Sequence, residues 1–333
     1  IIYSNMIKPV KAAAYIALIF VLAFTPLVAA KKTRTDNDFP LKPAGHEQIL
    51  TLWHVETFEG GVGSRGDFIN GRAVEFGEKG RHVLVKTHTA ESAKAALGKG
   101  EKPDLVSFGI GADFVVPLVK QVTLTVAGDK IKSRAFVWAQ GGYFLFRKSG
   151  DETPVKTLTI SDGGKNLPHG AVRLTGVKYE NIETVKSTDA YLKLISGKTD
   201  AMIGTQRDIR RFTVKNFAYI ATPLEKYNDL YQYVAITTDD ENKLPTAKAF
   251  AEYLLSEKTA KKISSLYMIP RYFSLTDSPL QSYDAAKNEK TISPFISPEN
   301  LEILKEDLTE SLALKEKCYS FENSLLSPSN ACN

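Results

Sequence analysis

Apolar positions in the first part of the chain alternate between short continuous runs and helical spacing. The segments 49–53, 82–87 and 105–108 each contain such a run and have the length of strands, and helical apolar spacing separates them. Ser64 and Thr89 precede the two helical stretches, and both are residue types that cap helix N-termini. The order strand, helix, strand, helix, strand predicts a parallel sheet with helices on its faces.

A similar unit is predicted further along the chain. Residues 171–174 are predicted to form a strand, Ser187 or Thr188 caps a helical pattern, and 201–204 form a buried strand. In both units Gly-Lys follows a helix and an Asp precedes the last strand. Because the unit does not recur at a fixed short period, the sequence predicts two similar α/β lobes and not a solenoid.

Two segments are predicted to join the lobes, and helices are predicted to follow. Aromatic residues surround Gly141-Gly142, and residues 231–237 are rich in β-forming types. Helical patterns cover 246–256 and 258–267, and 299–317 has leucines along one side. The predicted segments are a leader at 1–30, a linker at 31–46, the first part of lobe I at 47–136, a hinge crossing at 137–147, lobe II at 148–230, the return to lobe I with C-terminal helices at 231–298, and a C-terminal helix and tail at 299–333.

The first thirty residues resemble a targeting segment. Lys8 and Lys11 precede an apolar stretch at 12–28, and small residues follow at 28–30. This order is typical of a secretory signal peptide, and an uncleaved membrane anchor at 12–30 is the alternative. In either case the rest of the chain is expected outside the cytoplasmic membrane, periplasmic or extracellular.

Composition and charge exclude several classes of protein. Of the 333 residues, 43% are hydrophobic and 24% are charged, which is ordinary globular composition and argues against disorder or a fibrous repeat. The net charge of +5 is small and scattered, so no nucleic-acid footprint is predicted. With two cysteines, Cys318 and Cys332, neither a zinc ribbon nor a disulfide scaffold is expected. The two could pair in an exported protein or remain free thiols.

Five ordered motifs carry a family resemblance over about residues 47–275. They are Leu-Thr-Leu-Trp-His at 50–54, Lys-Gly-Glu-Lys-Pro-Asp-Leu-Val-Ser at 99–107, Val-Trp-Ala-Gln-Gly-Gly-Tyr-Phe-Leu at 137–145, Phe-Ala-Glu-Tyr-Leu-Leu-Ser at 250–256 and Tyr-Met-Ile-Pro at 267–270. Together they resemble an extracytoplasmic solute-binding protein of an ABC importer, of the sugar-binding family-1 type. The chain departs from the family pattern in having no lipobox cysteine and an unfamiliar tail after residue 274.

The resemblance implies an α/β fold of the type II periplasmic-binding-protein-like class. It implies two lobes joined by crossing strands, a solute bound between them, and hinge closure over it. The implied partners are a small-molecule solute, with a saccharide favoured, and an ABC permease in the cytoplasmic membrane; the chain is expected to act as a monomer. No cofactor, metal or nucleic acid is implied.

Candidate binding residues follow from the rule that ligands lie beyond the carboxyl ends of parallel strands. The first strand ends in Trp53, His54 and Glu56, with Arg65 after a Gly-rich turn. Trp stacks on sugar rings, whereas Glu and Arg form hydrogen bonds with hydroxyl groups. The alternatives are that Trp53 belongs to the core and that Arg65 selects an anionic solute.

Further candidates lie in lobe II and on the crossing segments. Thr205, Arg207 and Asp208 follow a buried strand at a helix start, where Asp208 could instead cap the helix. On the crossing segments the candidates are Trp138, Tyr143 and Tyr231, and the neighbouring glycines could allow close approach, flexing or both.

Enzyme signatures are weak in this sequence. The five histidines form no metal-binding helix motif, and there is no Gly-x-Ser-x-Gly elbow. The Gly-x-Gly at 109–111 lacks the rest of a dinucleotide fingerprint. His54 and Glu56 could form a base–acid couple, but alternate residues of a strand share one face in any case. We therefore expect a receptor with no catalytic residues, and a solute sensor without a transport role is the alternative to an importer subunit.

Overall fold

The computed structural model describes residues 49–56, 64–77, 81–274, 280, 282–284 and 288–332. The predicted leader at 1–30 and linker at 31–46 lie outside these residues. The strands are β1 (Ile49–Glu56), β2 (His82–Thr89), β3 (Leu105–Phe108), β4 (Val122–Val126), β5 (Asp129–Ser133), β6 (Phe136–Gln140), β7 (Tyr143–Lys148), β8 (Thr157–Asp162), β9 (Asn181–Lys186), β10 (Ala201–Thr205), β11 (Tyr219–Pro223) and β12 (Tyr231–Ile236). The helices are α2 (Arg65–Gly77), α3 (Ala90–Gly98), α4 (Pro168–Thr175), α5 (Ser187–Ile195), α6 (Gln206–Val214), α7 (Leu244–Leu254), α8 (Glu257–Ile263), α9 (Pro298–Leu314) and α10 (Tyr319–Ser324), with short 3-10 turns at Asp113–Val115 and Ser264–Leu266.

Lobe I is built on a five-stranded sheet in the order β2-β1-β3-β12-β6. Strand β1 runs parallel to β2 and β3, whereas β12 is antiparallel to both β3 and β6. The sheet is therefore mixed and not wholly parallel as expected. Strand β12 returns from lobe II and enters at the edge where β3 ends, so it has to run in the opposite direction.

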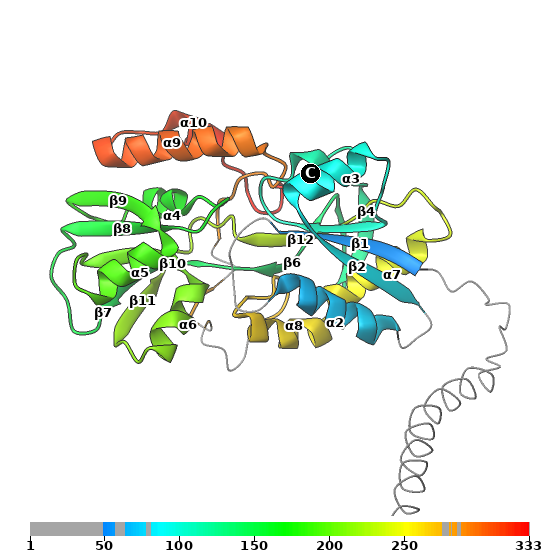
Figure 1. Cartoon of the computed structure of the whole chain (residues 1–333), viewed down its shortest axis with the longest axis horizontal. Coiled ribbons are helices and arrows are strands. Elements are labelled where there is room, and N and C mark those ends of the chain that lie inside the picture. Colours follow the sequence, from blue (N-terminus) through cyan, green and yellow to red (C-terminus); the bar gives the residue numbers. More distant parts are fainter. Residues whose placement is uncertain are drawn as a thin grey trace, which may run out of the picture. The chain divides into compact units, whose positions relative to one another are not determined.

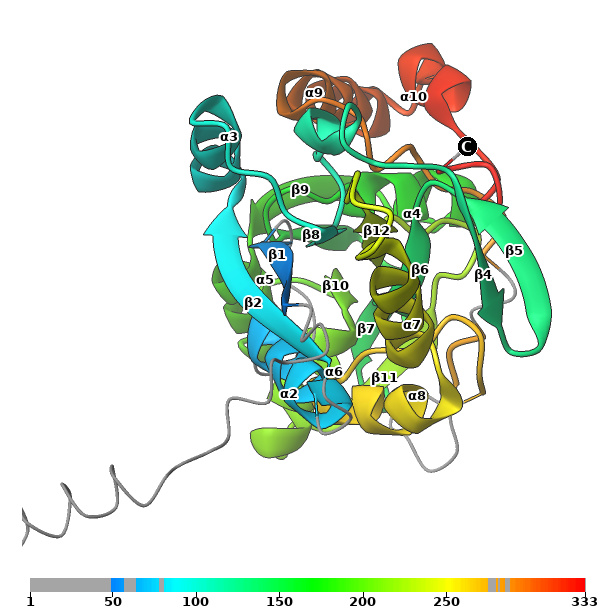
Figure 2. The same ribbon diagram turned by 90° about the vertical axis from the view of Figure 1, so that its right-hand side faces the viewer.

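Helices cover both faces of the lobe I sheet (Figures 1 and 2). Alternate residues of β1 serve the two faces, because successive side chains of a strand point to opposite sides. Leu50 and Leu52 join a core cluster with residues of α2 and α7, whereas Trp53 and Val55 join a second cluster with the alanines of α3. The predicted caps are confirmed for these helices: Asp67 N donates to Ser64 Oγ at 3.0 Å, and Ser92 N donates to Thr89 Oγ1 at 3.2 Å.

Lobe II is built on a second five-stranded sheet in the order β11-β7-β10-β8-β9. Strands β8, β9 and β10 are mutually parallel, and β7 is antiparallel to β10 and β11. A separate hairpin is formed by β4 and β5. The predicted α/β fold with two lobes is thus confirmed, and Figure 1 shows β6 and β7 leading from one sheet to the other.

The prediction of a strand at 171–174 is wrong. These residues lie in α4, which has Pro168 in its first turn and ends at Gly176 with a left-handed φ of 70°. The four residues at 171–174, Ala-Val-Arg-Leu, are too few for periodicity to distinguish a strand from a helix turn. The strands of this region are β8 and β9, which the sequence reading missed. Nor do Ser187 or Thr188 cap α5: Lys186 holds the N-cap position, and Ser187 Oγ donates instead to the carbonyl of Asp162 at 3.1 Å.

The C-terminal segment contacts both lobes. Helix α9 packs against α4 and β9 of lobe II (Figure 1), and its predicted leucine side is buried at positions 301, 304, 308 and 312. Tyr179 OH donates to the Leu312 carbonyl at 2.9 Å, whereas Ala331 and Cys332 belong to the lobe I cluster that contains Trp53. Cys318 and Cys332 are both buried and free, and they lie in different core clusters.

Candidate ligand-binding site

Two sheet edges adjoin at the crossing between the lobes. In lobe I, β1, β3 and β6 end and β12 begins at the same edge, because β12 is antiparallel to its neighbours. In lobe II, β8, β9 and β10 end where β7 begins. Only Gly141 and Gly142 separate β6 from β7, so these two edges adjoin. This is where ligands bind in open α/β sheets.

His54 is the buried polar group of the lobe I edge. Its Nδ1 lies 3.2 Å from Ser107 Oγ on β3, and Trp138 Nε1 on β6 donates to the same oxygen at 3.1 Å. Burial, with a smaller contribution from the positive charge of Arg65, lowers the pKa of His54 from 6.5 to about 3. The imidazole is therefore neutral at physiological pH, and its Nε2 has no hydrogen-bond partner among the described residues.

The other predicted groups of this edge differ in exposure. Glu56 is exposed at the end of β1, and Arg65 is partly buried at the start of α2. The structure thus brings Arg65 close enough to His54 to influence its titration, and Glu56 shares a face of β1 with His54.

The four predicted aromatic residues are all buried, with exposed fractions of 0–2%. Trp53 faces α3, and its ring centroid lies 4.6 Å from that of His88. Trp138 stacks on Phe68 of α2 at 5.8 Å, with the ring planes 8° apart. These rings are enclosed by protein on the faces that a sugar would stack against, so we assign Trp53 to the core and leave it out of the binding proposal. The rings of Tyr143 and Tyr231 are enclosed as well.

The predicted lobe II residues begin α6. Thr205 is the N-cap: its side chain accepts from the helix backbone, and Asp208 Oδ2 accepts from Thr205 N at 3.0 Å. Asp208 also pairs with Arg211 at 3.1 Å, while Arg207 is partly buried. The capping role weighed for Asp208 is therefore present as half of a reciprocal capping box, and its ion-pair partner is Arg211.

Gln206 was not selected from the sequence, yet it holds the crossing segment to lobe II. Gly142 N donates to Gln206 Oε1 at 2.9 Å, and Gln206 N donates to the Gly142 carbonyl at 3.1 Å. A Cβ at Gly141 would lie 2.6 Å from Gln206 Oε1, and a Cβ at Gly142 would lie 2.4 Å from the Tyr283 ring. Both glycines thus serve close approach, which is one of the two roles that the sequence left open.

A buried carboxylate joins the two crossing segments. Asp229 accepts from Tyr143 OH at 2.6 Å, from Leu167 N at 2.7 Å and from Tyr227 OH at 3.1 Å. Burial raises the pKa of Asp229, and these three donors oppose that effect. Asn166 Nδ2 donates in turn to Tyr143 OH at 2.9 Å. Tyr143 OH is therefore held between Asp229 and Asn166 within this buried network. The signal that could have located the network is the polar pair Asn228-Asp229, just before the buried strand β12.

A further buried polar side chain lies beside the glycines of the crossing. Gln140 is fully buried, and both atoms of its side-chain amide have no hydrogen-bond partner among the described residues. Gln206 Nε2 is also buried and has no hydrogen-bond partner among the described residues. Unpaired buried amides are costly, so such groups commonly mark sites that a ligand or water completes.

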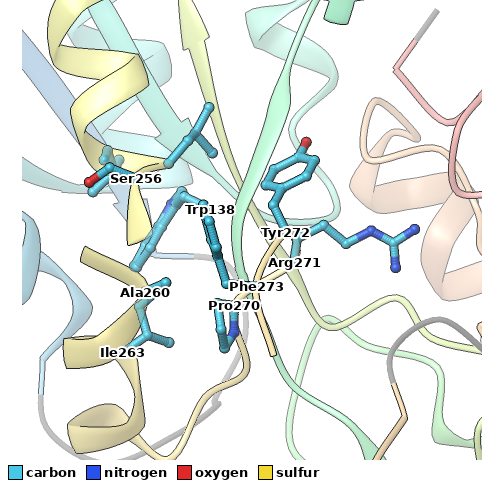
Figure 3. A pocket seen from close by; sticks show the side chains of 10 residues that line it. Trp138, Ser256, Ala260, Ile263, Pro270, Arg271, Tyr272 and Phe273 are labelled. Carbon is cyan, nitrogen blue, oxygen red and sulfur yellow. The ribbon is translucent and has the colours of Figure 1, made fainter. Parts of the chain in front are cut away.

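A small pocket lies among β6, the α7–α8 turn and residues 270–273. Figure 3 shows Ala260 and Ile263 beside the ring of Trp138, whereas the side chains of Arg271 and Tyr272 point the other way. Its empty volume is about 160 Å³, below the roughly 300–1,000 Å³ of typical ligand pockets. We therefore do not assign the solute to it.

Metal and membrane features were also sought in the described ranges. Those residues contain no group of three or more His, Cys, Asp or Glu side chains that could hold a metal ion. Within the same ranges, no helix is long and apolar enough to cross a membrane.

No protein-family model matches the chain, and no curated protein matches it in sequence. Solved structures do match. An ABC transporter structure from Clostridium perfringens ATCC 13124 is 13% identical over 78% of this chain and 99% of that chain, with a TM-score of 0.58. Iron-bound HitA from Pseudomonas aeruginosa is 14% identical over 78% and 99%, with a TM-score of 0.51. The GacH receptor of Streptomyces glaucescens GLA.O, solved unliganded and with acarbose, is 16% identical over 85% and 95%, with a TM-score of 0.50.

At these identities the likeness concerns the fold. The chain has the type II periplasmic-binding-protein-like fold of ABC-transporter substrate-binding proteins, as the sequence motifs predicted.

Proposed function

We propose that this protein is an extracytoplasmic solute receptor that binds a small solute where the two sheet edges adjoin and delivers it to an ABC permease. The observation that carries the proposal is the position of three buried side chains at or beside those edges: His54, Gln140 and Gln206. Each has a polar atom without a partner in the part of the chain that the structure describes. The matching fold supports it, since proteins of this architecture close by hinge motion around ligands.

A neutral saccharide is the favoured ligand. The buried amides and the neutral imidazole are uncharged donors and acceptors, which suit hydroxyl groups. GacH, which shares the fold, was solved with acarbose. The buried aromatic rings give no support to stacking, so this choice rests on the polar groups and on the family resemblance. An anionic solute is the alternative, favoured by Arg65 and Arg207 beside the two edges.

Export and a monomeric state belong to the same proposal. The apolar segment at 12–28 after two lysines supports export, with or without cleavage. A sensor without a transport role would use the same site and differ only in its membrane partner. A secreted enzyme is the least favoured alternative, and it would lose turnover on His54→Ala where a receptor would lose affinity.

The first experiment is a thermal-shift screen of the full chain against sugars, oligosaccharides, amino acids, peptides and oxyanions. Ligand at about 100 times its dissociation constant stabilises a protein by about 2.7 kcal/mol, which raises Tm by several degrees for a chain of this size. Stabilisation by one chemical class would support the receptor and choose between the saccharide and the anion. No stabilisation by any class would count against it.

Small-angle scattering tests the closure step. With a saturating hit from the screen, we expect the radius of gyration to decrease as the lobes rotate about the crossing segments. An unchanged radius of gyration with bound ligand would contradict hinge closure while leaving binding intact.

A further inference from the structure

Three buried side chains from three strands form one hydrogen-bonded line in lobe I. Trp138 Nε1 on β6 lies 3.1 Å from Ser107 Oγ on β3, and the same oxygen lies 3.2 Å from His54 Nδ1 on β1. Ser107 and His54 are direct neighbours in the strand register, and Trp138 reaches them across β12. All three side chains are buried, with exposed fractions of 0–1%.

The chemistry and the burial of these groups assign the protons in the line. An indole N–H can only donate, so Ser107 Oγ accepts from Trp138. The oxygen of Ser107 has room for a second donor, but its own buried hydroxyl proton also needs an acceptor, and His54 Nδ1 is the acceptor within reach among the described residues. We therefore assign Ser107 as the donor and His54 Nδ1 as the acceptor. A neutral imidazole has one acceptor and one donor nitrogen, so the proton of His54 lies on Nε2. Burial keeps the ring neutral.

The resulting Nε2–H is a buried donor without a partner among the described residues. The ring that carries it lies two residues before the end of β1, at the edge that adjoins lobe II. A Cβ at Gly66, in the first turn of α2, would lie 3.4 Å from His54 Cδ2. The N-terminus of this 13-residue helix therefore lies beside the imidazole.

We propose that His54 Nε2–H donates a hydrogen bond to an uncharged oxygen of the solute, and that Ser107 and Trp138 are positioning residues that hold the ring in the donor tautomer. This inference rests on the proposed receptor function. It adds the direction of one hydrogen bond: the protein donates and the solute accepts. A neutral donor suits a hydroxyl or carbonyl oxygen, whereas an oxyanion would gain more from an imidazolium.

The tautomer can be measured without any ligand. Two-dimensional nitrogen–proton NMR of histidine-labelled protein distinguishes a protonated from an unprotonated ring nitrogen, and His54→Asn identifies the signals of His54. We expect wild-type His54 to carry its proton on Nε2 alone. Ser107→Ala and Trp138→Phe should each produce a detectable Nδ1–H fraction, and Ser107→Thr, which keeps the hydroxyl, should restore the wild-type spectrum.

Two results of this experiment would overturn the positioning role: a wild-type proton on Nδ1, or an unchanged tautomer in both Ser107→Ala and Trp138→Phe. The readout is specific, because a purely structural defect would lower stability without moving the proton between nitrogens. If Trp138→Phe fails to fold, the comparison of Ser107→Ala with Ser107→Thr tests the positioning role by itself.

The ligand contact is tested by titrating wild type, His54→Asn and His54→Gln with maltotriose, acarbose and sulfate. The first substitution keeps an acceptor near Nδ1 and removes the donor, whereas the second places an amide N–H near the position of Nε2. We expect His54→Asn to weaken binding of a saccharide by about tenfold or more, as for one lost buried hydrogen bond, and His54→Gln to recover much of it.

Each outcome distinguishes this inference from the receptor proposal. If a saccharide stabilises wild type and His54→Asn with equal affinity, the contact is refuted and the receptor stands. Binding of sulfate in place of the sugars would refute the uncharged oxygen. If none of the three probes nor any compound of the thermal-shift screen binds, the receptor proposal fails and the contact fails with it, whatever the tautomer.

Discussion

Acidification is expected to destabilise this protein through His54. Burial and the nearby charge of Arg65 lower the pKa of this imidazole from 6.5 to about 3 in the folded state. The unfolded chain takes up a proton near pH 6.5, whereas the folded chain does not until the pH falls much further. The contribution of the neutral ring to stability is therefore complete above pH 6.5 and is lost progressively as the pH falls toward 3.

The expected loss of unfolding free energy is a large fraction of the stability of a typical domain. Integrating the two titrations gives about 2 kcal/mol lost between pH 7 and pH 5 and about 5 kcal/mol when the loss is complete. His169 in α4 should add a second loss of about 2 kcal/mol over the first interval, because burial, aided by the charge of Lys305, lowers its pKa from 6.5 to about 4. Together these losses approach the lower end of the roughly 5–15 kcal/mol by which proteins are stable.

Urea unfolding at several pH values between 7 and 5 measures these losses. The proteins to compare are wild type, His54→Asn, which keeps an acceptor for Ser107, His169→Gln, and the double variant. Between pH 7 and pH 5, the free energy of unfolding of each single variant should fall by about 2 kcal/mol less than that of wild type. For the double variant the difference from wild type should be about 4 kcal/mol. Carboxylates titrate in all four proteins, so the differences isolate the imidazoles. If His54→Asn has the same pH dependence as wild type, His54 is not held neutral and the reasoning is refuted.

Three other predictions concern the hinge and the cysteines. Gly142→Ala should destabilise the protein by about 1–3 kcal/mol in urea unfolding, because the new Cβ would meet the Tyr283 ring at 2.4 Å; Gly98→Ala, where nothing lies within 4 Å, is the control and should be neutral or slightly stabilising. Tyr143→Phe should cost about 1–3 kcal/mol, because it removes the 2.6 Å donor to Asp229, and an unchanged midpoint would show that this network does not hold the hinge. Thiol titration should find both cysteines unreactive in the folded protein and two free thiols after unfolding; finding none after unfolding would show a disulfide.

Local sequence signals predicted the elements of lobe I well. Ser64 and Thr89 cap α2 and α3 because their side-chain oxygens reach backbone N–H groups within the same turn, which requires no distant contact. The buried leucine side of α9 was also predicted from the sequence, because helical spacing itself places those residues on one face. Prediction failed at α4, where the four residues at 171–174 are too few to carry a periodic signal and the tertiary position decides between strand and helix.

The candidate site could be predicted only in part from the sequence. The rule for strand ends located His54 and the start of α6, because strand direction follows from the order of elements. It could not locate Ser107 or Asp229, and it could not show that Gln206 holds the crossing segment, since each acquires its role from a partner more than fifty residues away in sequence. Nor could it show that Trp138 and Tyr143 are enclosed, because a large aromatic residue has the same local signature in a core and in a binding surface.

The sequence by itself therefore determined an α/β fold with two lobes and located the ends of β1 and β10, because hydrophobic periodicity and capping are local. Only the tertiary structure decided which polar groups meet at those ends. Pairing of β1, β3, β12 and β6 brings Trp138, Ser107 and His54 into one line, and the burial that this pairing causes keeps the imidazole neutral. Hydrogen bonding and desolvation depend on neighbours in space, and a linear sequence does not specify those neighbours until the chain is folded.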